Sequence, residues 1–188
     1  MPRPRSDEKR TALLEAATRI IVTHGLSAPT AGIAKEAGIP NGSLFTYFET
    51  KTDLLNQLYL ELKGEMAATA LKGLPARAEP RERMFHTWRN WTNWAVTFPE
   101  KRQVLAQLSV SGEITAESRA AGRKMMADLA ELADQSRATG AMRNAPLGFV
   151  LSIMNSVAEA TMDCMAQDAA NAKKRCKEGF DAVWRMVA

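Results

Sequence analysis

Cysteine, histidine and aromatic residues are scarce in this chain. Its 188 residues include two cysteines, two histidines and 6% aromatic side chains. Cys164 and Cys176 are too far apart to form a C-x-x-C motif, and a zinc site of four Cys and His ligands would also need His24 and His86. We therefore predict no metal site and no cofactor, with both thiols reduced and buried.

Signals for export, membrane insertion and catalysis are also missing. The charged N-terminal residues are not followed by an apolar segment, so we expect no signal peptide. The most apolar region, residues 147–165, contains Asn155, Glu159 and Asp163, which disfavour a membrane span. No nucleophile elbow, phosphate-cradling loop or metal motif is found. These absences predict a cytoplasmic protein that is not an enzyme and does not bind a membrane.

The remaining composition is that of an ordinary soluble globular protein. The chain is 46% hydrophobic and 24% charged, with a net charge of +4. Residues 1–51 and the rest of the chain each carry a net charge of +2. This mild basic excess allows a polyanionic partner without requiring one, so any affinity for a polyanion must come from local placement of side chains.

The hydrophobic pattern predicts an all-α fold. Apolar residues recur at spacings of three and four, and alternating strand patterns are absent. Every proline falls between the periodic segments or at their starts. We predict helices over residues 6–24, 30–37, 41–48, 50–72, 81–98, 99–111, 114–137, 147–167 and 171–187.

The helix predicted over residues 147–167 is apolar on two sides. One stripe contains Leu147, Leu151, Met154, Ala158 and Met162, and the other contains Val150, Ile153, Val157, Ala160 and Cys164. A helix with two apolar sides must be covered on both. We expect its own domain to cover one side and a second chain to cover the other.

Two short helices around Gly38 fit a helix-turn-helix. Gly38 can adopt the positive φ that the turn requires, and the small Ala34 lets the helices cross closely. Thr30 is expected to cap the first helix, leaving backbone amides for a phosphate. A plain helical hairpin with a glycine turn is the alternative.

The second short helix leaves a face of small or hydrogen-bonding side chains, as expected in a major groove. This face consists of Asn41, Gly42, Ser43, Thr46 and Tyr47. Lys51, at the start of the next helix, can reach a phosphate.

The stretch from Leu13 to Leu55 resembles the TetR family of bacterial transcriptional repressors. The matching residues are Ala16-Ala17, Gly25, Thr30, Ile33-Ala34, Ala37-Gly38-Ile39, Gly42, Ser43-Leu44-Phe45, Tyr47-Phe48, Lys51 and Leu54-Leu55. Arg3-Pro4 and residues 12–18, 58–60 and 159–163 further resemble the RamR-type multidrug-responsive repressors.

This resemblance implies a two-part regulator. Residues 1–50 would form a three-helix DNA-binding domain with a helix-turn-helix, and residues 51–188 a helical domain for ligand binding and dimerisation. The homodimer would pair its last two helices in a four-helix bundle and bind double-stranded DNA at a palindromic operator. A small hydrophobic or aromatic effector would release it from the operator.

The resemblance also assigns the DNA contacts. The family's phosphate contacts fall on Thr30, Ser43, Tyr47 and Lys51, and its base-edge contacts fall on Asn41, Gly42 and Thr46. The chain departs from the family at Phe45, where tyrosine is usual. The missing hydroxyl removes one expected phosphate contact, although the ring can still pack.

Three tryptophans, Trp88, Trp91 and Trp94, lie within seven residues. They indicate either core packing or a ligand cavity. The resemblance favours a cavity for planar or cationic aromatic compounds, with Tyr59, Trp88, Trp91, Leu151 and Met154 as contacts. Glu159 and Asp163 would be counter-ions for a cationic effector or would pair with a local base.

A helical small-molecule-binding protein or transferase with no role at DNA is the rival interpretation. A salt-sensitive, sequence-specific shift of DNA by the protein would separate the two.

Overall fold

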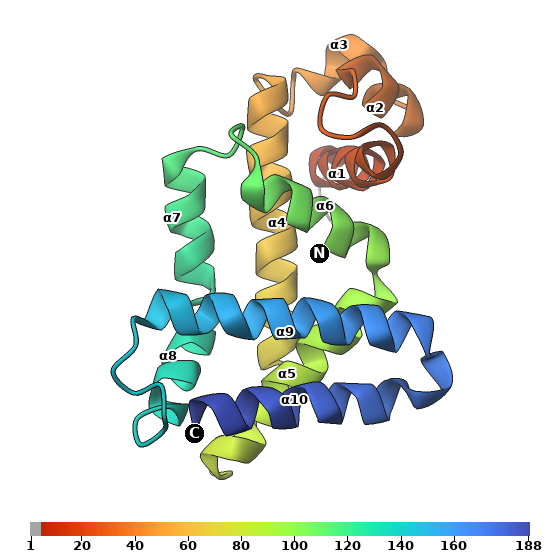
Figure 1. Cartoon of the computed structure of the whole chain (residues 1–188). Helices are drawn as coiled ribbons and strands as arrows, with labels where there is room; N and C mark the ends of the chain where they lie inside the picture. The colour runs from red at the N-terminus through yellow and green to blue at the C-terminus, as the bar shows by residue number, and fades with distance from the viewer. Residues whose placement is uncertain (1–4) are drawn as a thin grey trace. The chain divides into compact units, whose positions relative to one another are not determined.

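The computed structural model describes residues 5–188, and helices joined by turns account for the secondary structure of that range (Figure 1). The predicted all-α class is confirmed. The helices are α1 (Arg5–His24), α2 (Thr30–Glu36), α3 (Asn41–Leu44), α4 (Lys51–Leu71), α5 (Pro80–Thr97), α6 (Pro99–Val110), α7 (Ala116–Met125), α8 (Ala127–Ser136), α9 (Leu147–Gln167), the short 3-10 helix η1 (Ala169–Asn171) and α10 (Ala172–Val187).

These helices form two compact units, each assembled from two separate segments of the chain. Unit 1 combines the chain up to residue 63 with residues 99–122, and unit 2 combines residues 64–98 with residues 123–188. The units are defined by packing, whereas the boundary expected after residue 50 concerns function. That boundary therefore stays a prediction.

Unit 1 is built around α1, which packs against α2 and α6, while α2 packs against α3. Each fully buried aliphatic or aromatic side chain in its core stabilises the fold by about 1.5–3 kcal/mol relative to an exposed one. The largest of these side chains are Leu13, Ile21, Ile33, Leu44, Phe48, Leu54, Leu55, Leu58, Val104 and Leu108.

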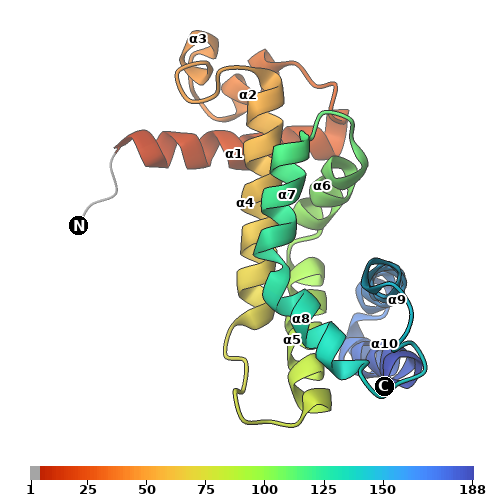
Figure 2. The same ribbon diagram turned by 90° about the vertical axis from the view of Figure 1, so that its left-hand side faces the viewer.

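In unit 2, α9 and α10 lie side by side, and α5 packs against both of them and against α8 (Figure 2). The close approach of α9 to α10 requires Gly179, because a Cβ there would come within 2.1 Å of Thr161 Oγ1. Phe180 is the centre of an aromatic cluster, with the rings of Phe85, Trp88 and Trp184 at centroid distances of 4.9, 6.3 and 6.0 Å.

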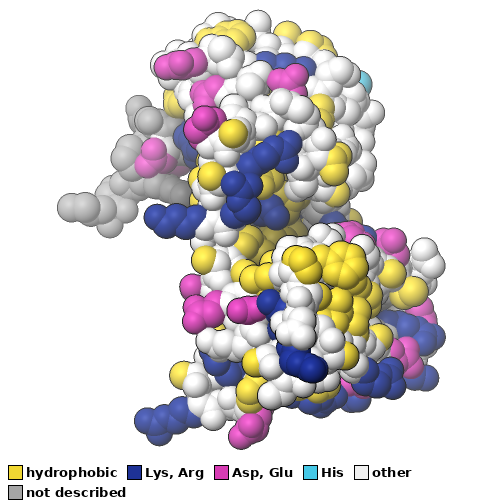
Figure 3. Space-filling model, turned by 60° about the vertical axis from the view of Figure 1, so that its left-hand side comes forward, with side chains coloured by type: hydrophobic (Ala, Val, Ile, Leu, Met, Phe, Trp, Pro, Cys, Tyr) yellow, Lys and Arg dark blue, Asp and Glu magenta, His cyan; other side chains and the backbone are white. Residues whose placement is uncertain are grey.

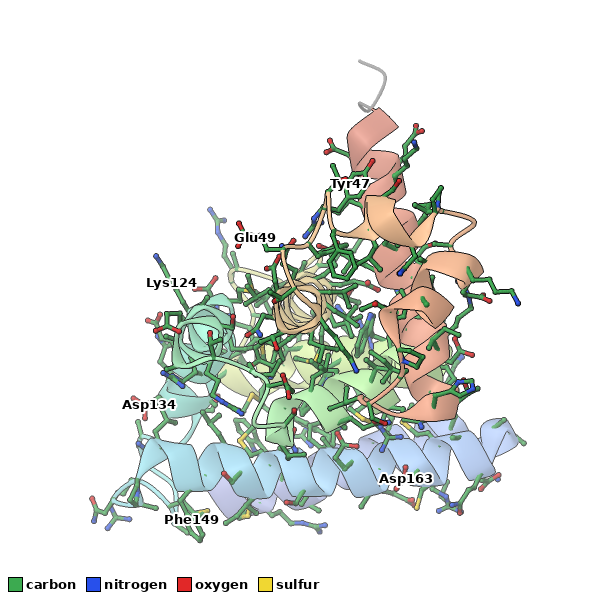
Figure 4. All side chains as sticks on the ribbon, turned by 90° about the horizontal axis from the view of Figure 1, so that it is seen from above. Tyr47, Glu49, Lys124, Asp134, Phe149 and Asp163 are labelled. Carbon is green, nitrogen blue, oxygen red and sulfur yellow. The ribbon has the colours of Figure 1, made fainter. Side chains whose placement is uncertain are left out.

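The outward side of α9 differs by one residue from the predicted stripe. Val150 is fully buried, and Phe149 is 56% exposed in its place. In Figure 4, Phe149 projects outward from α9. With the half-buried Ile153 and Val157 and the exposed Ala160 and Cys164, it forms an apolar stripe at spacings of three and four, which we call the outer stripe of α9.

Two predicted helices were too long. The single helix expected over residues 114–137 is interrupted at Met126, whose N–H donates to the carbonyl of Arg123 at 3.1 Å, a three-residue step instead of the α-helical four. The helix expected over 41–48 ends at Leu44. Beyond it, Thr46 and Tyr47 make the same three-residue step, to Ser43 and Leu44.

The two thiols differ in their surroundings. Both are free, but only Cys176 is buried, so the prediction of two buried thiols is wrong for the exposed Cys164. Burial raises the pKa of the Cys176 thiol and keeps it protonated at neutral pH. Within residues 5–188, no cluster of three or more potential metal ligands occurs, and no helix has the length and apolar character needed to span a membrane.

Candidate functional site

The turn between α2 and α3 is fixed by backbone geometry at Gly38. Gly38 has a φ of +68° and donates its N–H to the carbonyl of Lys35 at 3.0 Å. Ile39 donates to the carbonyl of Ala34 at 2.9 Å. This pair of bonds is a Schellman motif, which needs a left-handed residue where glycine carries no steric penalty. The predicted helix-turn-helix turn is therefore confirmed.

Thr30 does not have the capping role predicted for it. It is the first residue of α2, the N-cap position is occupied by Pro29, and no side-chain bond caps this helix. Proline suits that position because it lacks an N–H, and its fixed φ directs the chain into the helix. Thr30 remains half-exposed at this end of α2.

The short helix α3 separates a buried side from an open one. Leu44 and Phe48 are fully buried, so they anchor the segment in the core of unit 1. Asn41, Gly42 and Thr46, the predicted base-reading residues, are all exposed. Ser43 and Tyr47, predicted to contact phosphate, are half-buried, and Figure 4 labels Tyr47 on the turn after α3. The structure thus brings the five predicted residues of this segment to its surface.

Lys51 is the first residue of α4 and lies within a capping arrangement formed by Thr50 and Asp53. Asp53 donates its backbone N–H to Thr50 Oγ1 at 3.0 Å, and its carboxylate accepts from the backbone N–H of Glu49 at 3.0 Å. This pair of bonds resembles a capping box, except that the carboxylate accepts from the N–H of Glu49, one residue before the N–H of Thr50 that a capping box would use. A cation in the first turn opposes the helix dipole, so Lys51 does not stabilise α4. A phosphate close to this end would favour both Lys51 and the dipole.

A polar network, which the sequence patterns did not reveal, holds α1 against α4. The Arg10 guanidinium donates twice to Gln57 Oε1, at 3.1 and 2.8 Å, and Gln57 donates to Asp53 Oδ1 at 2.9 Å. The same guanidinium lies 5.9 Å from the ring centre of Phe48. This network orients the end of the helix-turn-helix relative to the start of α4.

Asn56 is a second positioning residue that the sequence did not reveal. Its buried amide donates to the carbonyls of Thr52 and Glu113, both at 2.8 Å, and accepts from the backbone N–H of Thr115 at 2.9 Å. Thr52 adds a bond from its hydroxyl to the Glu113 carboxylate at 2.8 Å. The loop between α6 and α7 is thereby tied to α4 about one turn beyond Lys51.

The effector residues predicted in unit 2 lie partly in its core. Trp88 is 4% exposed, and its indole N–H donates to the carbonyl of Cys176 at 3.0 Å. Its ring meets Trp91 edge to face at 6.1 Å. Met154 is buried, while Trp91 and Leu151 are half-buried. Because the polar atom of Trp88 is already satisfied, this arrangement favours the core interpretation of that residue.

Tyr59, the predicted effector residue of unit 1, lies against α7. A Cβ at Gly122 would come within 2.8 Å of the Tyr59 hydroxyl, so the ring depends on a glycine there. The Lys63 ammonium lies 6.0 Å from the ring centre, and burial lowers the pKa of Lys63. A role for Glu159 or Asp163 as counter-ion stays a prediction.

Comparison with known proteins finds sequence similarity in the helix-turn-helix region. Residues 13–58 match the family described as bacterial regulatory proteins, tetR family. The fatty acid metabolism regulator protein of Bacillus subtilis (strain 168) is 27% identical over 77 residues, an alignment that spans 40% of this chain and 40% of that relative.

Two solved structures are similar over nearly the whole chain. A tetR-family transcription regulator from Shewanella sp. PV-4 has a TM-score of 0.84 and 26% identity, covering 94% of this chain and 96% of its own. The regulator FadR from Bacillus subtilis, solved in complex with stearoyl-CoA, has a TM-score of 0.67 and 16% identity, covering 93% and 95%. At that identity, the second likeness concerns the fold alone.

The regulators of this family are DNA-binding proteins and not enzymes. The matched region, residues 13–58, contains the whole helix-turn-helix and the start of α4. The family's fold extends beyond it through both units. The chain is therefore similar to the transcriptional regulators of the tetR family, by sequence in its helix-turn-helix and by fold over nearly its whole length.

Proposed function

We propose that this chain binds a palindromic operator as a homodimer, represses transcription there, and is released by a small-molecule effector. The observation that carries the proposal is the segment of α3 and the turn after it, whose open side presents Asn41, Gly42 and Thr46 while Leu44 and Phe48 hold it in the core. Short polar side chains on an anchored helix suit the major groove. We place this regulator in the cytoplasm.

The proposed contacts divide by chemistry. Asn41, Gly42 and Thr46 read base edges. Phosphate contacts come from Thr30, Ser43, Tyr47 and Lys51, the last at the positive end of α4. Since the net charge of the chain is only +4, these local contacts carry the affinity.

Selection of bound sequences from a random DNA pool tests the operator proposal. Purified protein should enrich a palindrome, and the affinity for it should fall steeply with added salt. Asn41→Ala should relax the preference at one position of each half-site. Failure to enrich any sequence at low salt would instead support the rival, a helical binding protein with no role at DNA.

The outer stripe of α9 supports the homodimer. A groove of about 450 Å³ lies between α9 and α10 and continues this stripe through Val157, Ala160 and Cys164. Figure 3 shows hydrophobic side chains gathered on the unit that carries these helices. A second copy would cover a ring as large as that of Phe149, which is costly to leave in water.

Sedimentation measurements test the dimer. Phe149→Arg should shift the protein towards monomer and weaken operator binding, because one protomer holds a single recognition segment. A control variant, Val110→Arg, changes a residue of α6 that is 86% exposed and should leave the sedimenting mass unchanged.

Cys164, inside the outer stripe of α9, should react with thiol reagents more slowly as protein concentration rises. Reaction at a constant rate would count against the dimer.

The effector is proposed to be a small, largely apolar molecule. Within unit 2, Trp91, Leu151 and Met154 are the proposed contacts, and the RamR-type resemblance favours planar aromatic cations of the multidrug class. A second candidate is a long-chain acyl-CoA, because FadR was solved with stearoyl-CoA. Half-buried Lys63 would offer that anionic ligand a charge partner.

Release of the operator separates these effector classes. An aromatic cation that releases DNA at micromolar concentration would support the multidrug proposal, and release by stearoyl-CoA would support the second. Lys63→Met should weaken the response to acyl-CoA more than the response to a cation. A compound can release the operator only if it binds the two conformers of the protein with different affinities.

A further inference from the structure

Phe45 is a large apolar side chain left in solvent at the proposed DNA surface. Its ring is 47% exposed, whereas the neighbouring Leu44 and Phe48 are fully buried. Within residues 30–51, it is the one large hydrophobic side chain that the structure leaves exposed. Its role therefore concerns something outside the core of unit 1.

Helical geometry places Phe45 close to Asn41 and Gly42, two of the proposed base-reading residues. At about 100° per residue, a position four after Asn41 lies roughly 40° from it and roughly 60° from Gly42. The backbone of Phe45 keeps right-handed helical angles, with φ −71° and ψ −7°, so this spacing still applies at the end of α3. Ser43 and Tyr47 fall on a different side.

A phenyl ring cannot form the hydrogen bonds that recognise a phosphate or the polar edge of a base. The apolar feature of the major groove is the C5-methyl group of thymine, which phenylalanine contacts in protein–DNA interfaces. We propose that Phe45 reads a thymine methyl group in each half-site and so determines specificity. This inference rests on the proposed function.

Replacing each operator thymine in turn by deoxyuridine tests the proposal, because it removes the methyl group and keeps the base pair. One thymine per half-site should be sensitive, with affinity falling about fourfold for a methyl-sized apolar contact. Phe45→Ala should abolish that sensitivity, and Phe45→Leu should retain part of it. If the effect of removing the thymine methyl group depends on whether residue 45 is phenylalanine or alanine, the two groups are in contact.

Two controls keep the result interpretable. Phe45→Ala should melt at nearly the same temperature as the parent protein, because the ring is outside the core. Thr46→Ala, on the next exposed position, should keep the sensitivity to deoxyuridine.

Three outcomes would overturn the inference in distinguishable ways. If operator binding is normal but no deoxyuridine matters, the methyl contact is absent and the proposed function survives. If Phe45→Ala weakens binding equally on thymine and uracil operators, the ring packs on the sugar–phosphate backbone instead. If no DNA is enriched, the proposed function itself fails.

Discussion

Lys51 occupies a position where its charge is unfavourable for the helix that carries it. It opens α4, next to backbone N–H groups that already carry partial positive charge. Lys51→Ala should therefore leave the melting temperature unchanged or slightly higher. It should also make operator binding less salt-dependent, lowering the slope by about 0.9 for each phosphate that Lys51 neutralises, hence by about 2 for a dimer.

Binding isotherms at several salt concentrations check this prediction. Lys173→Ala, a lysine exposed on α10, is the matched control and should leave the slope unchanged. An unaltered slope for Lys51→Ala would remove the phosphate contact from the proposal.

Trp88 presents the opposite case, a side chain whose burial decides between two roles. Its indole is 4% exposed and its N–H is bonded to Cys176. Trp88→Ala should lower the free energy of unfolding by about 3–5 kcal/mol, measured by urea denaturation. Trp91→Ala should lower the free energy of unfolding by less, because Trp91 is only half-buried. A stable Trp88→Ala protein that is impaired only in effector affinity would restore the ligand-cavity interpretation.

At the scale of elements, Asn56 connects parts of the chain that are distant in sequence. Its partners Glu113 and Thr115 lie 57 and 59 residues away. Asn56→Ala removes the hydrogen bonds of a buried amide to the Glu113 carbonyl and the Thr115 N–H, so it should destabilise the protein by about 1–3 kcal/mol. Because the loop between α6 and α7 is then no longer bonded to α4, the operator affinity should also change less when the effector binds.

Chemical denaturation and operator release at saturating effector test these two effects of Asn56→Ala. Thr52→Val removes only the exposed bond to Glu113 and is the milder comparison. A destabilised Asn56→Ala variant with an unchanged effector response would leave the loop with a structural role only.

The elements that could be predicted are those with local signals. Gly25 and Gly38 stand at helix ends with φ near +70°, and the bounds of α9 follow from Pro146 and its apolar pattern. The break at Met126 has no such signal, since neither proline nor glycine marks it. The contacts of Arg10 and Asn56 could not be predicted because they join residues about fifty positions apart. Of the predicted site residues, Asn41, Gly42 and Thr46 are exposed and Ser43 and Tyr47 are half-exposed, but that they touch DNA remains a prediction.

At the scale of the whole molecule, unit 1 is completed by a segment that follows α5 in sequence. Helix α6 packs against α1, and its Val104 and Leu108 are fully buried in unit 1. A peptide of residues 1–50 lacks this cover and the whole of α4. We therefore expect its circular dichroism to show little helix and no cooperative melting, in contrast to the full chain. A cooperatively folded peptide would show that the helix-turn-helix can fold without α6 and α4.

The split composition of unit 1 also constrains how such a regulator can be recombined. A single crossover after the helix-turn-helix would join α1 of one parent to α6 of another and mismatch the core that they share. A hybrid that keeps its DNA specificity and gains a new effector must inherit residues 1–63 and 99–122 from the same parent. Gene fusion at one junction is thus a poor route to new regulators of this design, whereas exchange of residues 64–98 together with 123–188 preserves both cores.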